Sequence, residues 1–219
     1  RFGIKPLYYR TDARLLSFGS ELKALMRQPD FSREIDVDAL EAFLAFNSIP
    51  APLTIFRQAR KLPAGHVMVW EGGELQLRRY ARPAPVTAEA VRPESGADLA
   101  AELRERLRDS VRAHLVSDVP VGVLLSGGID SSGLTALAAE ESPEQVNTFS
   151  IGFEESSFDE LAQARLLAER YGTNHHELVL RPDAVELLPR LVEAFDEPFG
   201  DSSALPTYLV SELAAGSVK

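Results

Sequence analysis

The amino-acid sequence predicts an α/β protein, a parallel sheet with helices on both faces that is preceded by a smaller α+β part. After residue 98, short apolar runs alternate with helical patterns, which is typical of parallel strands joined by helices. Before residue 83, short strands and turns surround two helical stretches. Residues 83–97 are rich in proline, alanine and small polar residues. We therefore expect two domains, 1–82 and 98–219, joined by a linker at 83–97.

The first part combines short strands with two helices. Strands are expected at 7–9, 15–18, 66–70 and 75–77, the last two joined by a hairpin turn at 71–74 that contains two glycines. Helical patterns cover 20–26 and 37–46, the second with Leu40, Phe43 and Leu44 on one face.

The second part begins with a long charged helix and then alternates strand and helix. Apolar residues recur every four positions from Leu99 to Leu115, before Pro120. Ser157 and Glu160 have capping-box spacing, and Gly172 stands where a helix commonly ends. Strands are expected at 121–125, 146–153 and 176–180, and helices around 134–138 and at 161–171, 182–195 and 206–215.

Composition and charge narrow the class of protein. The longest clear apolar run, 121–125, is far shorter than the roughly 20 residues of a membrane span. The sequence has no cysteine and no signal segment, so we expect a cytoplasmic protein without disulfides or thiolate sites. Residues 1–82 have a net charge of +4 and residues 83–219 one of −14. Such an acidic second part would repel phosphates, so neither nucleic acid nor a membrane is an expected partner.

The segment SGGIDSS at 126–132 directly follows the predicted strand at 121–125 and precedes a helix. Glycines at such a junction let the backbone turn sharply and leave N–H groups unpaired at a helix N-terminus, where the helix dipole is positive. The serine hydroxyls can donate further hydrogen bonds. The segment therefore predicts a seat for phosphate oxygens, whereas a lone Gly-Gly pair would indicate an ordinary turn.

The carboxylate of Asp130 indicates that this phosphate-binding segment also requires a cation. This carboxylate would repel a bare phosphate unless a divalent cation lay between them, so Asp130 indicates Mg²⁺. No Gly-Lys pair follows the glycines, and the lysine of a Walker A loop is missing. Transfer of a γ-phosphoryl group by the P-loop route is therefore not expected.

Together with its neighbours, this segment resembles a known family. VPVGVLLSGGIDSS at 119–132 is similar to the pyrophosphate loop of the N-type ATP pyrophosphatases, and TFSIGF at 148–153 and DEPFGDSSALPTYL at 196–209 resemble later segments of the glutamine-dependent asparagine synthetases. RFGIKPLYY at 1–9 and KLPAGH at 61–66 resemble the last part of that family's glutaminase domain. The glycine loop alone is shared with several other synthetases, but its combination with GIKPLYY is more specific.

The resemblance implies a sheet of the adenine nucleotide alpha hydrolase type, preceded by part of an N-terminal-nucleophile glutaminase domain. It implies an ATP-dependent amide ligase in which ATP and the side-chain carboxylate of aspartate, or a related carboxylate, form an acyl-adenylate and pyrophosphate. Ammonia from glutamine then attacks the acyl-adenylate, which leaves an amide and AMP. A homodimer of the full-length protein is a further expectation.

The resemblance also implies roles for particular residues. The backbone at Leu125 and Ile151 would flank the adenine and ribose, and Asp130 would position Mg²⁺ on the pyrophosphate, acting electrostatically as the one catalytic candidate. The pyrophosphate itself would be held by Ser126, Gly127, Gly128, Asp130, Ser131 and Ser132.

The sequence departs from the family at both ends. The family's glutaminase nucleophile is an N-terminal cysteine, whereas this chain has no cysteine and begins at Arg1. It ends on Val218-Lys219, which resembles the start of a further strand, before the family's acidic glycine-rich loop. We expect an internal fragment of a longer protein that does not hydrolyse glutamine and is inactive by itself.

Other functions stay open at this point. Amidotransferases acting on a saccharide or peptide precursor share these motifs, as does a β-lactam-forming synthetase, and a non-catalytic nucleotide-binding fragment is the alternative from a different class. Asp196, Glu197 and Asp201 would either meet Mg²⁺ or the amine at the sheet edge or be solvated loop charges. His175 and His176 adjoin on a predicted strand and should point to opposite faces, so they are not expected to share a metal ion.

Overall fold

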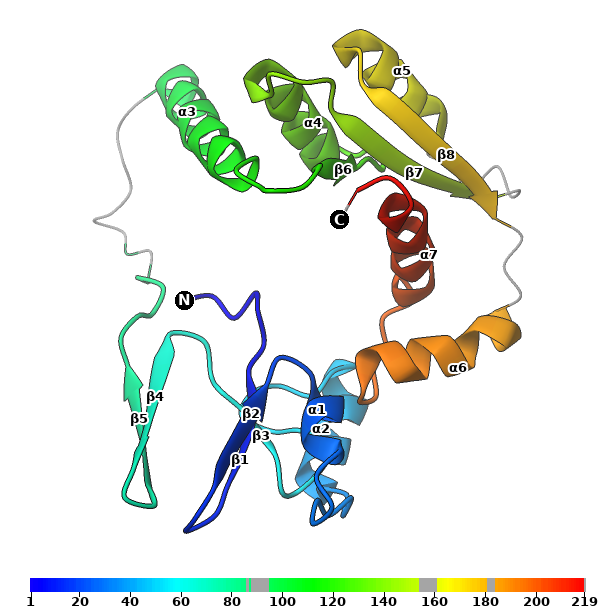
Figure 1. The fold of residues 1–219 in the computed structure, drawn as a ribbon. Helices are drawn as coiled ribbons and strands as arrows, with labels where there is room; N and C mark the ends of the chain where they lie inside the picture. Colours follow the sequence, from blue (N-terminus) through cyan, green and yellow to red (C-terminus); the bar gives the residue numbers. More distant parts are fainter. Residues whose placement is uncertain (86, 88–94, 154–160, 181–183, 219) are drawn as a thin grey trace. The chain divides into compact units, whose positions relative to one another are not determined.

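The computed structural model describes residues 1–85, 87, 95–153, 161–180 and 184–218. The chain divides into two compact units, one formed by 1–88 with 188–202 and the other by 89–187 with 203–219 (Figure 1). Residues 188–202 thus belong with the first unit, whereas the division expected from the sequence places them in the second part. The chain leaves the second unit, returns to the first, and then re-enters the second.

Two antiparallel sheets form the strand portion of the first unit. β1 (Tyr8–Thr11) pairs with both β2 (Leu16–Gly19) and β3 (Arg60–Lys61). β4 (His66–Glu71) and β5 (Glu74–Arg79) form the predicted hairpin, and both glycines of its turn have positive φ. β3 was not predicted, because two residues are too few to show an alternating pattern and only the pairing with β1 defines them as a strand.

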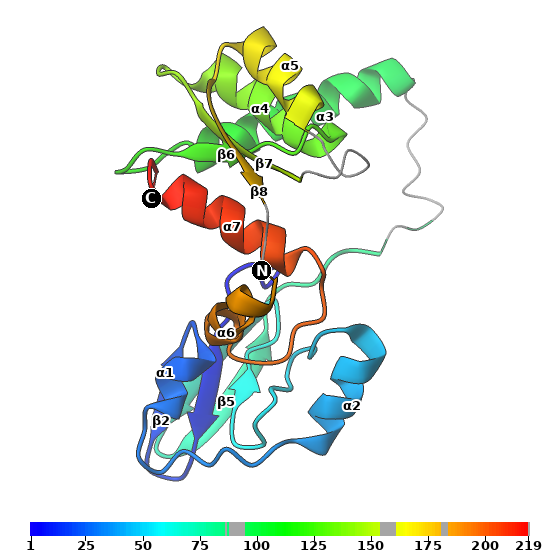
Figure 2. The same ribbon diagram turned by 90° about the vertical axis from the view of Figure 1, so that its right-hand side faces the viewer.

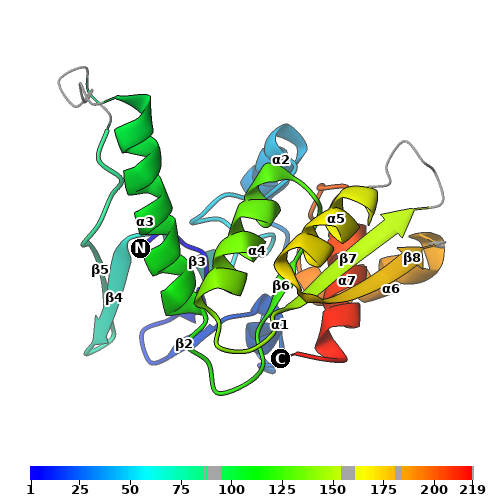
Figure 3. The same cartoon turned by 90° about the horizontal axis from the view of Figure 1, so that it is seen from above.

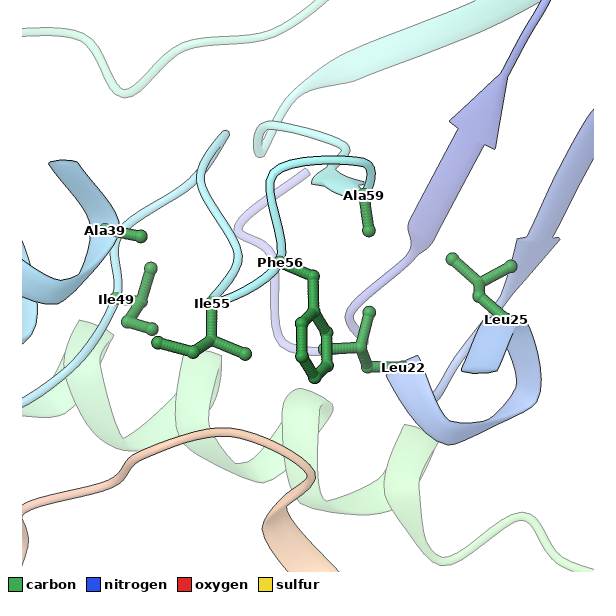
Figure 4. Packing of buried hydrophobic residues seen from close by; sticks show 7 residues of the cluster. All are labelled: Leu22, Leu25, Ala39, Ile49, Ile55, Phe56 and Ala59. Atoms are coloured by element: carbon green, nitrogen blue, oxygen red, sulfur yellow. The ribbon is translucent and has the colours of Figure 1, made fainter. Parts of the chain in front are cut away.

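The core of the first unit lies between its helices and the loop that precedes β3. α1 (Leu22–Met26) is short, and α2 (Val37–Phe46) coincides with its predicted range. α2 ends at Asn47, which adopts the left-handed conformation with φ 57°. Figure 4 shows the buried cluster, which consists of Leu22, Leu25, Ala39, Ile49, Ile55, Phe56 and Ala59.

The second unit contains the predicted parallel sheet, in the order β6 (Gly122–Leu124), β7 (Asn147–Phe153) and β8 (Asn174–Leu180). α7 (Ala204–Ala215) covers the opposite face of this sheet from three other helices (Figure 2). These three lie side by side when seen from above (Figure 3), and they are α3 (Gly96–His114), α4 (Ile129–Glu141) and α5 (Leu161–Tyr171). The predicted fold class, a parallel sheet with helices on both faces, is confirmed.

Small buried clusters attach each helix to this sheet. Phe149 at the centre of β7 is 1% exposed and packs against Val210 and Ala214 of α7. Gly172 has φ 62° directly after α5, as expected of a glycine that ends a helix, whereas the proposed capping box at 157–160 lies outside the described residues. The further helix α6 (Ala184–Phe195) crosses from the second unit to the first. Among the described residues, no helix combines the length and apolarity that a membrane span requires.

Candidate functional site

The loop between β6 and α4 has the backbone of an anion-binding turn. Gly127 has φ 80°, a conformation that side chains disfavour, and Gly128 is the N-cap of α4. No side chain caps this helix, so the first backbone N–H groups of α4 have neither an intrahelical partner nor a capping one. The positive end of the helix dipole lies at the same point. The sequence predicts phosphate binding at this position, and that role stays a prediction.

The serine hydroxyls make hydrogen bonds within the loop. Ser131 and Ser132 both donate their hydroxyl hydrogens to the carbonyl of Gly128, at 3.2 and 2.5 Å. The Ser131 oxygen lies 3.0 Å from that of Ser126 and accepts the Ser126 backbone N–H at 3.2 Å. Since a hydroxyl has a single hydrogen, Ser126 is then the donor of the pair. In this conformation the three hydroxyls hold the loop together, and the first N–H groups of α4 are the donors without an intrahelical or capping partner.

Asp130 lies in the first turn of α4 and is exposed. Within the described part of the chain, no three histidine or acidic side chains gather into a group that could hold a metal ion. A Mg²⁺ ion at Asp130 would therefore take most of its ligands from phosphate oxygens and water, an arrangement that this ion favours.

A pocket of about 510 Å³ adjoins the loop within the second unit. Its walls come from the end of β6, the middle of β7 and the first turns of α7, and they combine apolar side chains with a few hydroxyls, as small-molecule sites do. The lining residues are Leu124, Leu125, Ser126, Phe149, Ser150, Ile151, Ser203, Pro206, Thr207 and Val210.

Three of the predicted site residues, Leu125, Ser126 and Ile151, line this pocket. The Leu125 N–H donates to the carbonyl of Phe149 at 2.8 Å, and its carbonyl accepts the hydroxyl of the buried Ser150. The other predicted residues, Gly127, Gly128, Asp130, Ser131 and Ser132, follow in the adjoining loop and the start of α4.

Sequence reasoning missed the contributions of Ser150 and of α7 to the pocket. Ser150 lies between two apolar strand residues, and its polarity in a buried strand was the available signal. For Ser203 and Thr207, the signal was a pair of hydroxyls at the start of a predicted helix. Their position beside β7 depends on how α7 packs on the sheet, which periodicity does not reveal.

The two histidines on β8 make separate contacts, in agreement with the prediction that they point to opposite faces. His176 stacks on Phe149 with ring centroids 4.9 Å apart. His175 lies 2.8 Å from the Thr148 hydroxyl and 3.1 Å from the Glu177 carboxylate. Burial lowers the pKa of His175, and the Glu177 charge opposes this effect only in part.

Asp196 and Glu197 are not solvated loop charges, so that reading of these two carboxylates is wrong. They belong to the first unit, where their side chains are 7% and 10% exposed and pair with Lys23 and Lys61. Local sequence patterns do not reveal these pairs, because the partners lie far apart along the chain. Asp201 is exposed.

Two protein-family models match the chain, one described as asparagine synthase at residues 102–219 and one described as glutamine amidotransferase domain at 1–81. Asparagine synthetase (glutamine-hydrolyzing) 1 of Bacillus subtilis (strain 168) is 38% identical over 218 residues, covering 97% of this chain and 33% of that protein. Putative asparagine synthetase (glutamine-hydrolyzing) 2 of Methanocaldococcus jannaschii is 34% identical, covering 98% and 42%.

The chain therefore spans less than half the length of these relatives. A solved structure, the NH3-dependent NAD synthetase from Campylobacter jejuni, is similar at 19% identity over 52% of this chain and 52% of that chain, with a TM-score of 0.36, which is too distant to bear on the site. The asparagine synthase match covers more than half of this chain and includes the β6–α4 loop and every residue that lines the pocket. The chain belongs to the asparagine synthase family.

Proposed function

We propose that the protein to which this chain belongs is an ATP-dependent amide ligase of the asparagine synthase (glutamine-hydrolysing) type. An oxygen of the aspartate side-chain carboxylate attacks the α-phosphorus of ATP, and the bond to the β,γ-pyrophosphate breaks. Ammonia then adds to the carbonyl of the acyl-adenylate, loses a proton and expels AMP, so the products are asparagine, AMP and pyrophosphate.

The observation that carries this proposal is the continuity of the β6–α4 loop with the pocket. The loop offers unpaired backbone N–H groups at a helix N-terminus, and the pocket beside it offers apolar walls and hydroxyls. A nucleotide spans these two environments, with its polyphosphate at the loop and its base and ribose near Leu125 and Ile151. Donors that are already oriented would stabilise the negative charge that develops on the departing pyrophosphate.

Asp130 is the residue proposed to hold Mg²⁺. The cation would neutralise charge on the polyphosphate when it is bound. Asp130 would orient it from the first turn of α4, and the absence of a clustered metal site among the described residues is compatible with a cation that enters with its nucleotide. The loop N–H groups would position the pyrophosphate independently of the metal.

The first unit supports glutamine as the proposed source of ammonia. Residues 1–81 match the glutamine amidotransferase domain, and relatives that align over nearly the whole chain are named glutamine-hydrolyzing. In this proposal, glutamine hydrolysis belongs to the longer protein.

An isotope experiment on the full-length protein tests the reaction. The protein is incubated with Mg·ATP, ammonia and aspartate labelled with ¹⁸O in its side-chain carboxylate, and the products are identified by mass spectrometry. We expect AMP that carries one ¹⁸O atom, because adenylation transfers a carboxylate oxygen to the α-phosphate. ADP and phosphate as products would overturn the adenylation. ATP binding without AMP formation would exclude aspartate as the acceptor.

A further inference from the structure

Residues 188–202 connect two parts of the second unit, yet they pack with the first. They lie inside the region that matches asparagine synthase, whereas most of the first unit matches the glutamine amidotransferase domain. The attachment is concentrated in a short stretch after α6, where Asp196, Glu197 and Gly200 each bind a different part of the first unit.

Asp196 is held twice by one residue of α1. Its carboxylate accepts the backbone N–H of Lys23 at 3.0 Å and lies 3.3 Å from the Lys23 ammonium. Burial would lower the pKa of Lys23, but hydrogen bonds to Asp196 and Glu21 outweigh it and the pKa is raised. Asp196 also has φ 65°, a conformation that costs free energy in a residue other than glycine. These contacts hold the chain at Asp196 in a backbone conformation that it would otherwise rarely adopt.

Glu197 is held in the same manner by a second lysine. Its carboxylate pairs with the Lys61 ammonium and accepts the backbone N–H of Ile55 at 3.2 Å. Lys61 also donates to the Ile49 carbonyl at 2.6 Å and lies over the ring of Tyr8. Burial, followed by the charges of Glu197 and Asp196, raises the pKa of Tyr8 to about 12, so the phenol stays neutral beside this pair.

We call the two carboxylates with Lys23 and Lys61 the acidic clamp. The two carboxylates and Lys61 are largely buried, whereas the Lys23 side chain is 38% exposed. Removing charged groups from water is costly, and buried pairs commonly stabilise a protein no more than apolar residues of similar size would. Their better attested use is to specify one geometry among alternatives. Three residues after Glu197, the Gly200 N–H donates to the Asn47 carbonyl at 2.9 Å, which extends the attachment.

The chain enters α7 only a few residues after the clamp. Ser203 is the N-cap of α7, and Ser203, Pro206 and Thr207 line the pocket beside the β6–α4 loop. We propose that Lys23 and Lys61 are positioning residues for this pocket, because they restrain the chain that leads into its α7 wall. The lysines themselves are not among the residues that line the pocket. The identity of the pocket's ligand as a nucleotide rests on the proposed function, whereas the restraint on α7 does not.

The test uses full-length protein carrying Lys61→Met or Glu197→Gln, with Lys61→Arg as the conservative variant. Hydrogen exchange of the amides of 204–209 is measured without nucleotide, and the Kd for Mg·ATP is measured by calorimetry. We expect exchange to accelerate and the Kd to rise, each by about fivefold or more, in the first two variants. Lys61→Arg should keep most of the original exchange rate and Kd. A double variant that combines Lys61→Met with Glu197→Gln should be less impaired than the sum of the two single effects, because both substitutions break the same ion pair.

A matched control is the exposed pair Arg57–Glu34, 2.9 Å apart in the same unit and with both side chains more than half exposed. Arg57→Met should change neither the exchange of α7 nor the Kd. Unchanged exchange in both Lys61→Met and Glu197→Gln would overturn the positioning role, as would an equal effect of Arg57→Met. If the unsubstituted protein binds no ATP, the proposed function fails, and the exchange measurement alone decides the positioning role.

Discussion

Individual residues of the β6–α4 loop provide two kinds of hydrogen-bond donor with different availability. The hydroxyls of Ser126, Ser131 and Ser132 are engaged within the loop, whereas the N–H groups at the start of α4 lack intrahelical partners. Binding that relied on the hydroxyls would first have to break these internal hydrogen bonds. Binding through the backbone would need no rearrangement, and this favours the backbone as the main anion contact.

Asp130→Asn removes the charge proposed to hold Mg²⁺ while keeping the size of the side chain. In the full-length protein, the affinity for Mg·ATP should fall about tenfold, because a carboxylate interacts with a cation far more strongly than an amide does. Affinity for ATP without Mg²⁺ should not fall, since Asp130 repels the bare polyphosphate. Calorimetry with and without Mg²⁺ measures both, with Asp118→Asn as an exposed carboxylate control. Equal losses under the two conditions would contradict a metal-linked role.

The partly buried His175 predicts a dependence of stability on pH. Its pKa in the folded state lies below the ordinary 6.5, chiefly through burial, so the unfolded chain takes up the proton first as the pH falls. The stabilisation from neutral His175 is complete above pH 6.5 and is lost as the pH falls through the folded-state pKa. Glu177, whose pKa the Arg165 hydrogen bond lowers, adds a loss in the same direction below its ordinary 4.5.

Urea unfolding between pH 8 and pH 5.5 measures this effect. His175→Gln should reduce the change in unfolding free energy over this range, because glutamine takes up no proton. His114→Gln, which replaces an exposed histidine of α3, should leave the change as it is. An identical pH dependence in the unsubstituted protein and His175→Gln would show that another group is responsible.

The element that matters most for the site is the strand–turn–helix unit formed by β6 and α4. Parallel pairing with β7 places the end of β6 beside Phe149, and the Leu125 N–H extends that pairing by one residue. The chain then turns at the two glycines, and α4 begins. Because the turn lies at the carboxyl end of a parallel strand, the helix N-terminus and the pocket share one edge of the sheet.

Gly128→Ala tests whether a ligand approaches the backbone of this turn. Gly128 has an ordinary φ of −71°, and an added methyl group would meet only the Ser126 hydroxyl, at 3.4 Å. The fold should therefore tolerate the substitution, whereas affinity for ATP should fall about tenfold as the methyl group obstructs the backbone donors. The melting temperature and the Kd distinguish these effects.

Gly133→Ala provides the control within the same helix, because a methyl group there meets no atom within 4 Å. It should stabilise α4 by about 0.5–1 kcal/mol and leave the Kd unchanged. If Gly128→Ala binds ATP as tightly as Gly133→Ala, the ligand does not approach the turn closely.

In the whole molecule, the order of the chain does not follow the order of its compact units. Residues 188–202 lie within the asparagine synthase match and pack with the unit that carries the amidotransferase match. Within this segment, Gly200 packs closely against Asn47 at the end of α2. A Cβ atom at residue 200 would lie 2.9 Å from the Asn47 Cβ.

Gly200→Ala should therefore destabilise the first unit, although residue 200 lies far along the chain from residues 1–88. We expect a cost of about 1–3 kcal/mol, typical of overpacking against atoms that have little room to move. Hydrogen exchange of the amides of 37–62 should accelerate, and those of β7 should be unaffected. Gly96→Ala, where the added methyl group meets nothing within 4 Å, is the control. Faster exchange confined to the second unit would contradict the assignment of 188–202 to the first.

The sequence by itself determined the features that depend on local pattern. Hydrophobic periodicity predicted the bounds of α2 and the positions of all three parallel strands. The segment at 126–132 indicated a turn between a strand and a helix. Such features are visible in a sequence because neighbouring residues produce them, through side-chain alternation, capping and the conformational freedom of glycine. The roles of Asp130 and of the other loop residues in binding stay predictions.

Only the tertiary structure decided which distant residues meet. It placed Ser203 and Thr207 of α7 beside β7, joined Asp196 to Lys23 and Glu197 to Lys61, and grouped 188–202 with the first unit. A carboxylate in a loop has the same local pattern whether it is solvated, binds a cation or pairs with a lysine more than a hundred residues away. The choice among these states depends on burial and on partners that the folded backbone brings close, and neither quantity is encoded in the spacing of nearby residues.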